Sequence, residues 1–495
     1  MNKIKLGWAE VSLLPEGKKV NLAGQFYERI TDEVETPITV TALAIECGDD
    51  SAIFCSCDLV SVSHTLLLRI REILSQYEGF PTEKVMISAI HTHTAPSYAK
   101  RSDSVAGSSL NVLTTLMPNV KYEKLVSYEG DDLFEGEEAF EFMAERIATA
   151  AKLAWDNRKD GMYAQGFGRA AVGMCRRVCY NDGSAKMWGD TDTATFTELE
   201  GGNDSGIELL FTFDENKKLT GVVANAACPA QVLEHRNFIS SDYWGKVKAL
   251  LRKEYGEDIF LLGLCSAAGD QCPRDMIRWV EPETPINDPN IVRNDVTVRV
   301  ADPSMFDVKG CELIGRRIAN EIFYAFEGVC EYVSEAEFEH RNLTVDMPLR
   351  RVTPAEVESA TKAIKDFAAE VGEGTINFAD NARMHIHAGV VARSNVQEKI
   401  DVVPIEVHVI RLGSIAFATN PYELFLDYGN RMRARSKASQ TFLIQLSCGS
   451  YGYLPTEKAE KGSHYSAYVS SGTAGHEGGD LLVRKTVSEI NGMIK

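Results

Sequence analysis

Alternating and periodic apolar positions predict a short series of elements in the first hundred residues. Two β-rich stretches around a Gly-Asp-Asp turn in residues 38–60, ITVTALAIECGDDSAIFCSCDLV, predict a β-hairpin. Residues 64–76 carry apolar side chains at helical spacing, and residues 85–90 are a short apolar run that is typical of a buried strand. His91 and His93 follow at the carboxyl end of that strand, which is where open α/β sheets bind their ligands.

The rest of the chain continues this mixture of helix and strand signals and has no internal repeat. We therefore predict an α/β fold of mixed β-sheets with packed helices, as one catalytic unit over residues 1–495. Residues 97–135 are predicted to form a lid-like loop, and residues 277–305 a surface excursion. Helices are predicted over 136–157, 243–255, 309–327, 354–371 and 421–436, strands over 205–213, 219–227, 259–264, 402–411, 414–419 and 441–447, and irregular structure over 372–400.

Composition and charge narrow the class of protein. The chain is 44% hydrophobic and 25% charged, which is an ordinary globular composition. Its formal net charge of −19 argues against binding to nucleic acid or to an anionic membrane surface. It has no secretory signal and no transmembrane run of about 18 apolar residues, and its 11 scattered cysteines indicate reduced thiols. We therefore expect a cytoplasmic protein.

His91 and His93 are the main candidates for chemistry. In an extended segment, side chains two residues apart point the same way, so both imidazoles would face one point. Such a pair suits a metal ion, or one metal ligand together with one group that transfers protons. The alternative is two histidines that make only structural hydrogen bonds, because the H-x-H spacing alone is a weak signal.

The surroundings of this pair resemble a known family. The stretch SAIHTHTAP is similar to the THTHSGP stretch of the neutral/alkaline, non-lysosomal ceramidases, which are zinc amidohydrolases. Further segments resemble that family in the same order, from about residue 5 to the C-terminus: DSAIFCSCDLVSV, ANAACPAQVLEHRNFISSDYWG, GLCSAAGDQCPRD, ATNPYELFLDYGNRMR and YGYLPTEKAEKGSHYSA. The chain is therefore identified as a divergent, bacterial-type member that comprises the family's catalytic domain without its C-terminal β-sandwich domain.

The resemblance implies a role for each residue that matches a family motif. It implies one zinc ion per chain, with ligands at His91, Glu423 and Tyr453. It implies active-site roles at His93, Tyr465 and Arg176. Tyr465 follows Tyr453 at the family's spacing of twelve residues, whereas Arg177 competes with Arg176 because the alignment there is loose.

Two cysteines depart from the family pattern. Cys228 stands where the family has its second zinc histidine, and it is predicted as the fourth ligand because a thiolate binds zinc well. His235 is a rival, but it lies seven residues out of register. Cys272 replaces the family's active-site serine and is predicted to be catalytic, since a cysteine keeps a nucleophile and a weak donor there. For both cysteines, the alternative is a small buried packing residue.

Together these residues predict a zinc-dependent hydrolase that cleaves the C–N bond of an N-acyl compound with metal-activated water. His93 would transfer protons, while Tyr465 and Arg176 would stabilise the oxyanion or anchor the substrate. We expect a small-molecule substrate that is more soluble than ceramide. The alternatives are a degenerate ceramidase-like protein that binds a metal or ligand without turnover, and a metallo-esterase.

Overall fold

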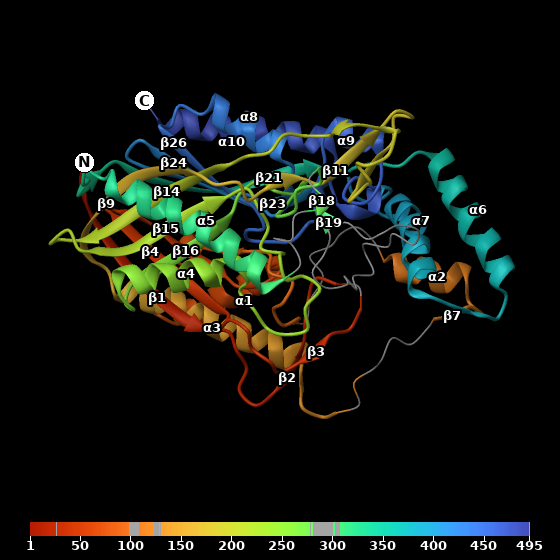
Figure 1. Ribbon diagram of the computed structural model, residues 1–495, viewed down its shortest axis with the longest axis horizontal. Coiled ribbons are helices and arrows are strands. Elements are labelled where there is room, and N and C mark those ends of the chain that lie inside the picture. Colours follow the sequence, from red (N-terminus) through yellow and green to blue (C-terminus); the bar gives the residue numbers. More distant parts are fainter. Residues whose placement is uncertain are drawn as a thin grey trace.

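The structure is a computed structural model of the 495-residue chain. It describes residues 1–25, 27–98, 108–122, 128, 130–277, 279–280, 300–301 and 307–494. Helices and strands alternate along the chain and form mixed sheets with packed helices (Figure 1), which confirms the predicted α/β class. Within these residues, no helix has the length and the apolar run that a membrane crossing requires.

The largest sheet has nine strands in the order β16-β15-β14-β9-β1-β4-β5-β6, with β20 paired to β1. The pairs β15–β16 and β5–β6 are parallel, and the other neighbours are antiparallel. The strands are β1 (Asn2–Ser12), β4 (Thr39–Cys47), β5 (Asp50–Cys57), β6 (Val85–Ala89), β9 (Lys159–Arg169), β14 (Gly206–Asp214), β15 (Leu219–Ala226), β16 (Phe260–Cys265) and β20 (Glu335–Ala336). The predicted hairpin is confirmed as β4–β5, and Gly48 supplies the left-handed backbone, with φ of 66°, at its turn.

Helices lie against both ends of this sheet. α1 (His64–Leu74) packs on α3 (Gly136–Asp156), and α3 contacts β1, β4 and β5. α4 (Asp242–Tyr255) packs on α5 (Val308–Glu327), which contacts β9 and β14. The sheet curls, because β16 at one end contacts β4 and β5 near the other end.

A second sheet of four strands has the order β21-β23-β24-β26. It contacts β5 through β21 and contacts β14, β15 and β16 through β26, so the apolar core lies between the sheets. Helices α8 and α10 pack on this sheet and on each other (Figure 1). The elements are β21 (Phe338–Pro348), β23 (Val402–Leu412), β24 (Ile415–Thr419), β26 (Gln440–Ile444), α8 (Leu426–Arg435) and α10 (His476–Met493).

The remaining elements are short strands and a separate group of helices. Helices α2, α6 and α7 pack on one another around their own hydrophobic cluster, at the right of Figure 1. The helices are α2 (Ser109–Leu116), α6 (Pro354–Val371), α7 (Phe378–Gln397) and α9 (Glu457–Gly462). The strands are β2 (Lys19–Asn21), β3 (Ile30–Thr31), β7 (Lys121–Tyr122), β8 (Leu133–Phe134), β10 (Met174–Cys175), β11 (Arg177–Tyr180), β12 (Ala185–Met187), β13 (Phe196–Leu199), β17 (Gln271–Cys272), β18 (Trp279–Val280), β19 (Val300–Ala301), β22 (Thr375–Ile376), β25 (Glu423–Leu424) and β27 (Tyr453–Leu454).

Three sequence predictions differ from the structure or fall outside it. Residues 372–400 were predicted to be irregular but contain α7, which begins after the side-chain cap of Asn377. The predicted loop 97–135 contains α2, and its residues 99–107, 123–127 and 129 lie outside the described residues. Most of the predicted excursion at 277–305 also lies outside them.

Several strands end close together, and their carboxyl ends build the candidate site. β6 and the segment that follows β26 are joined by the hydrogen bonds Ala89 N to Leu446 O and Cys448 N to Ile87 O. The segment that follows β24 joins them, because Asn420 N donates to Ile444 O. His91, Glu423, Cys228 and Cys272 come from the segments that leave β6, β24, β15 and β16.

Candidate active site

His91 turns sharply at the end of β6 instead of continuing the strand. Its φ is 72°, a left-handed conformation that is uncommon outside glycine and that clusters at functional sites. The prediction of an extended segment through His91 and His93 is therefore wrong, and the backbone N–H groups of His91 and Thr92 both donate to Leu59 O, in the segment that follows β5. The two imidazoles still come together, with ring centroids 4.8 Å apart and planes at 79°.

The imidazole of His91 is held in one tautomer. Its Nδ1 lies 2.7 Å from the carbonyl oxygen of Val60, and because a carbonyl only accepts, Nδ1 carries the proton. This leaves Nε2 with a lone pair, and Nε2 lies 3.5 Å from Oε2 of Glu423. A carbonyl that accepts from the other ring nitrogen and so fixes the ring is the usual support of a metal-binding histidine.

Glu423 and Tyr453 are cross-strand partners. They face each other in the parallel pair β25–β27, and Glu423 N donates to Gly452 O. Glu423 was predicted near the start of a helix, but it lies in this short strand, and α8 begins only at Leu426. Burial raises the pKa of Tyr453 well above its ordinary value, and the Glu423 carboxylate adds to the effect. The pairing explains why residues thirty positions apart reach the same point.

His93 is enclosed by Gly24 and Glu234. Its Nδ1 lies 3.5 Å from Oε2 of Glu234, whose side chain is 9% exposed. Gly24 has φ of 94°, and a Cβ at this position would lie 2.5 Å from the ring carbon Cγ of His93. A side chain at residue 24 would therefore push His93 out of place.

Arg176, and not Arg177, reaches the candidate site. Its guanidinium donates to Gly269 O at 3.1 Å and to the hydroxyl of Tyr453 at 3.4 Å. Burial by itself would lower the pKa of Arg176, but the neighbouring Tyr453, Cys272 and Glu423 raise it, so the group stays a cation. Arg176 is thus placed to donate to an anion that forms at the site.

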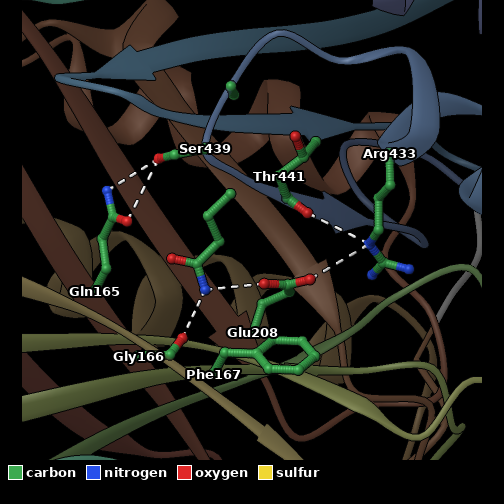
Figure 2. Close-up of a pocket in the computed structure, with 9 residues that line it drawn as sticks. Gln165, Gly166, Phe167, Glu208, Arg433, Ser439 and Thr441 are labelled. Atoms are coloured by element: carbon green, nitrogen blue, oxygen red, sulfur yellow. Dashed lines mark hydrogen bonds and ion pairs between the residues drawn. The ribbon is translucent and has the colours of Figure 1, made fainter. Parts of the chain in front are cut away.

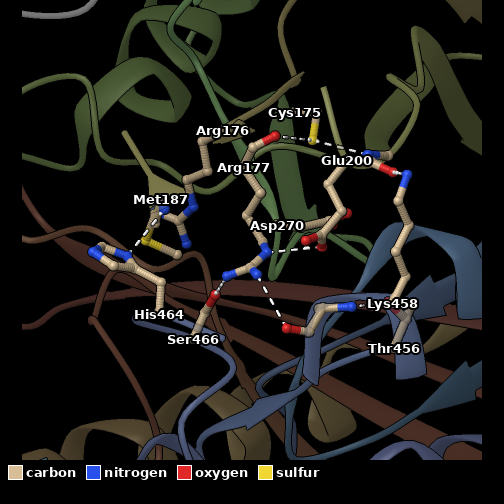
Figure 3. A network of polar contacts seen from close by, with 12 residues as sticks. Cys175, Arg176, Arg177, Met187, Glu200, Asp270, Thr456, Lys458, His464 and Ser466 are labelled. Atoms are coloured by element: carbon tan, nitrogen blue, oxygen red, sulfur yellow. Dashed lines mark hydrogen bonds and ion pairs between the residues drawn. The ribbon is translucent and has the colours of Figure 1, made fainter. Parts of the chain in front are cut away.

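Arg177 points away from the site and holds the chain that carries Tyr465. It is fully buried and donates to Glu200 Oε1 at 2.8 Å, to Tyr465 O at 3.0 Å and to Ser466 Oγ at 3.2 Å. Figure 3 shows the two guanidinium groups diverging, with that of Arg177 between Glu200 and Ser466. Arg177 therefore supports the position of Tyr465 without lining the site.

A cavity of about 230 Å³ is lined by His91, His93, Arg176, Tyr453 and Tyr465, among other residues. Tyr465 is 39% exposed there, and its ring centroid lies 5.5 Å from that of Tyr453. Trp188 forms part of the wall beneath Arg176, whose guanidinium lies 5.6 Å from the ring centroid. The described residues that line the cavity are Gly24, Gln25, His91, His93, Arg176, Met187, Trp188, Gln231, Glu234, Tyr453, His464 and Tyr465.

Sequence reasoning missed several of these wall residues. Gln231 and Glu234 lie three and six residues after Cys228, in the segment that resembles the family, but the family pattern predicts no role for either residue. A polar side chain close to a candidate ligand in the same loop is the signal that could have found them. Trp188 carried no such signal, because it reaches the site through tertiary packing.

Cys228 and Cys272 are buried beside the cavity and do not line it. The Cys228 thiol donates to Val172 O at 3.3 Å, and the Cys272 thiol donates to Arg274 O at 3.3 Å. Burial raises the pKa of Cys228 well above its ordinary value and that of Cys272 to about 12. Both predicted roles, as metal ligand and as catalytic residue, therefore stay predictions.

Two of the candidate ligand atoms lie at a separation that fits a zinc ion. In a tetrahedral site with zinc–nitrogen and zinc–oxygen distances of about 2.0–2.1 Å, two ligand atoms lie roughly 3.4 Å apart. The 3.5 Å separation of His91 Nε2 and Glu423 Oε2 matches this value. Tyr453, beside Glu423, offers a third oxygen.

A different trio, Glu406, His408 and Cys448, is the one group among the described residues in which three His, Cys, Asp or Glu ligand atoms all lie within 4.8 Å of one another. Its carboxylate is already engaged, because Arg71 donates to both oxygens of Glu406 at 2.9 and 2.6 Å. The imidazole of His408 is engaged as well, by Glu406 at 2.6 Å and by His340 at 2.8 Å. The His91 site therefore remains the better candidate for a metal.

Comparison with known proteins agrees with this fold. No family model matches the sequence, and no curated protein matches it. Among solved structures, the chain is similar to neutral ceramidase from Pseudomonas aeruginosa, with 16% identity and a TM-score of 0.67 over 99% of this chain and 75% of that chain. It is also similar to a ceramidase complexed with C2, with 15% identity and a TM-score of 0.67 over 98% of this chain and 74% of that chain. The chain therefore has the fold of the neutral ceramidases.

Proposed function

We propose that this protein is a metal-dependent hydrolase that cleaves the linear amide bond of an N-acyl compound. The observation that supports the proposal is that His91, His93, Arg176, Tyr453 and Tyr465 line one cavity, with the carboxylate of Glu423 3.5 Å from His91. An amide needs a strong nucleophile and a proton for its leaving amine, and this set offers a metal-ligand trio next to an imidazole. The shared fold with ceramidases supports the same chemistry.

We propose that His91, Glu423 and Tyr453 hold one zinc ion. When bound, zinc lowers the pKa of water and polarises a carbonyl oxygen. Three protein ligands leave a fourth position open, which is the arrangement of catalytic zinc sites. The alternative, with Cys228 as a fourth ligand, requires the thiol to leave Val172 O and turn toward the cavity.

The chain's own residues would carry the remaining chemistry. His93, 3.5 Å from Glu234, takes a proton from water and gives it to the leaving nitrogen. Arg176 and the hydroxyl of Tyr465 donate to the developing oxyanion. Cys272, with a thiol pKa of about 12, stays protonated at neutral pH and would act only as a weak donor.

The substrate that we propose is a small N-acyl compound. The described residues enclose about 230 Å³, which is less than the roughly 300–1,000 Å³ of pockets that hold drug-sized ligands. Gln231 and Glu234 offer polar atoms to a substrate, beside the apolar side chains of Met187 and Trp188. The predicted cytoplasmic location, which would suit such a substrate, stays a prediction.

A second candidate function, a degenerate protein that binds a ligand without turnover, is favoured by one observation. Cys228, which replaces a family metal ligand, is fully buried with its thiol directed at Val172. One assay separates the two functions: zinc-loaded protein with a panel of N-acyl 4-nitroanilides of increasing acyl length and a short-chain ceramide. We expect hydrolysis of the short anilides that is lost in Glu423→Gln. Metal binding without turnover of any amide would contradict the hydrolase and support the degenerate protein.

A further inference from the structure

A second pocket lies where the two sheets diverge, at the far end of β26 from the candidate active site. Its volume is about 460 Å³, in the range of pockets that hold small molecules. It is formed by β9, β14, the end of α8 and the start of β26 (Figure 2). β26 begins in this pocket at Gln440 and runs toward the candidate active site, so the two sites are separate.

One wall of the pocket is an aromatic ring. Phe167, on β9, is 48% exposed although it lies within a strand of the nine-stranded sheet. Figure 2 shows its ring beside the Glu208 side chain, and the two residues are cross-strand partners. The guanidinium of Arg169 lies 5.2 Å from the centroid of this ring, so the opposite face is the one that a ligand's C–H groups would contact.

A buried acceptor without a donor lines the same pocket. Gln440 is 9% exposed, and its amide nitrogen donates to Gly166 O at 2.7 Å and to Glu208 Oε2 at 2.9 Å. These two acceptors fix the orientation of the amide, because a flipped amide would place oxygen against oxygen. The Oε1 of Gln440 then has no hydrogen-bond partner among the residues that the structure describes. A buried oxygen in this state calls for a donor from outside the protein.

The charges of the pocket compensate one another. Arg433 donates to Asp204 Oδ2 at 2.8 Å and to Ser266 Oγ at 2.7 Å, so most of its guanidinium is committed. Its Nε lies 3.7 Å from Oε1 of Glu208, whose pKa is raised by burial. An anion would have to displace Asp204, and a cation would meet Arg433. The pocket therefore suits a neutral ligand.

We propose that this pocket binds a neutral, hydroxyl-rich molecule of the size of a pyranose sugar. A hydroxyl group of the ligand can donate to Gln440 Oε1 or to Glu208, whereas Arg433 Nε already donates to Thr441 O at 3.5 Å. The C–H face of the sugar ring would lie on Phe167. The opposite rim is formed by the side-chain amide of Gln165 and by the hydroxyl of Ser439, to which the amide donates at 3.2 Å. This binding does not depend on the proposed hydrolase function.

The test is a ligand-observed NMR titration of the full chain with D-glucose, D-galactose and N-acetyl-D-glucosamine. We expect saturable binding of at least one sugar with a Kd of roughly millimolar order. Phe167→Ala removes an exposed ring and should weaken that binding by about tenfold or more. Tyr324→Ala, which removes a ring that is 75% exposed on α5, is the matched control and should leave the Kd unchanged.

Three results would overturn the proposal. The first is no saturable signal for any of the sugars up to about 50 mM. The second is equal sugar binding by wild type and Phe167→Ala, which would place the sugar elsewhere. The third is tighter binding of inorganic phosphate or ethylammonium than of every sugar, which would mean that the pocket selects charge. If Phe167→Ala does not fold, Gln165→Ala at the exposed rim replaces it, with the same expectation.

Discussion

Replacing Arg177 tests whether this buried guanidinium supports the strand and loops around the candidate site. Five hydrogen bonds radiate from it: Nε to Glu200 Oε1, Nη1 to Tyr465 O and Ser466 Oγ, and Nη2 to Ala459 O and Ser463 O, at 2.8 to 3.3 Å. The guanidinium of Arg177 thus joins β11 to α9 and to the segment that carries Tyr465. Arg177→Met keeps much of the side-chain length and removes all five donors.

The expected loss of stability follows from the groups left behind. Glu200 is 9% exposed, and removing one partner of a buried ion pair costs about 3–5 kcal/mol. The carbonyl groups freed at Tyr465 and Ser463 belong to exposed residues, where water can reach them, and the buried Ala459 O keeps its hydrogen bond from Ser463 N, so these groups add little. We therefore expect Arg177→Met to lower the free energy of unfolding by about 3–5 kcal/mol, against a typical total of about 5–15 kcal/mol.

Urea denaturation followed by tryptophan fluorescence measures this change. Arg177→Lys should lose less free energy of unfolding than Arg177→Met. The lysine ammonium can still pair with Glu200, but it cannot make all five hydrogen bonds of the guanidinium. Arg351→Met is the matched control: the Arg351 side chain is 56% exposed and pairs with an Asp401 that is 85% exposed, so the loss should stay below about 1 kcal/mol. A loss below about 1 kcal/mol for Arg177→Met would refute the reasoning.

Three further predictions concern other parts of the structure. Gly24→Ala should lower hydrolysis by about 10²-fold, because the added Cβ would displace His93. The control is Gly79→Ala, where φ is 72° and the space around the residue is open, and this variant should leave turnover unchanged. Equal activity of the two variants would contradict the packing of Gly24 against His93. With Ellman's reagent, the native protein should show one fast thiol, the exposed Cys330, and all 11 thiols after denaturation; several fast thiols would contradict the burial. Burial raises the pKa of Asp58 to about 6, so its folded form holds the proton more tightly and stability falls as pH rises from about 4 past 6. Between pH 5.5 and 7.5 wild type should lose about 1 kcal/mol more than Asp58→Asn, and parallel pH profiles would argue against the shift.

The elements that the sequence predicted well are those whose signal is local. The hairpin at residues 38–60 became β4–β5, and the helix from residue 64 became α1, because alternation, helical spacing and turn residues act over short distances. α7 was not predicted because its apolar and polar residues are not segregated on opposite faces, so the sequence shows no amphipathic pattern there. The helix start expected at Pro421 was displaced to Leu426 by the pairing of Glu423 with Tyr453, which no local pattern shows.

The candidate site was predictable only as a set of residues. The family motifs named His91, His93, Arg176, Tyr453 and Tyr465, which line one cavity, and Glu423, whose carboxylate lies 3.5 Å from His91. Their arrangement depends on tertiary contacts such as the left-handed turn at His91 and its bond to Val60 O. The burial of Cys228 behind the wall and the approach of Glu234 to His93 likewise follow from packing.

Metal content tests the central claim most directly. Wild type, His91→Ala and Cys228→Ala would be loaded with zinc under reducing conditions, desalted and measured by mass spectrometry. If His91, Glu423 and Tyr453 hold the ion, wild type and Cys228→Ala bind about one zinc per chain and His91→Ala binds none. Loss of zinc in Cys228→Ala would instead make the thiol the fourth ligand. A wild type that binds no zinc, or a His91→Ala variant that keeps its zinc, would contradict the proposed metal site.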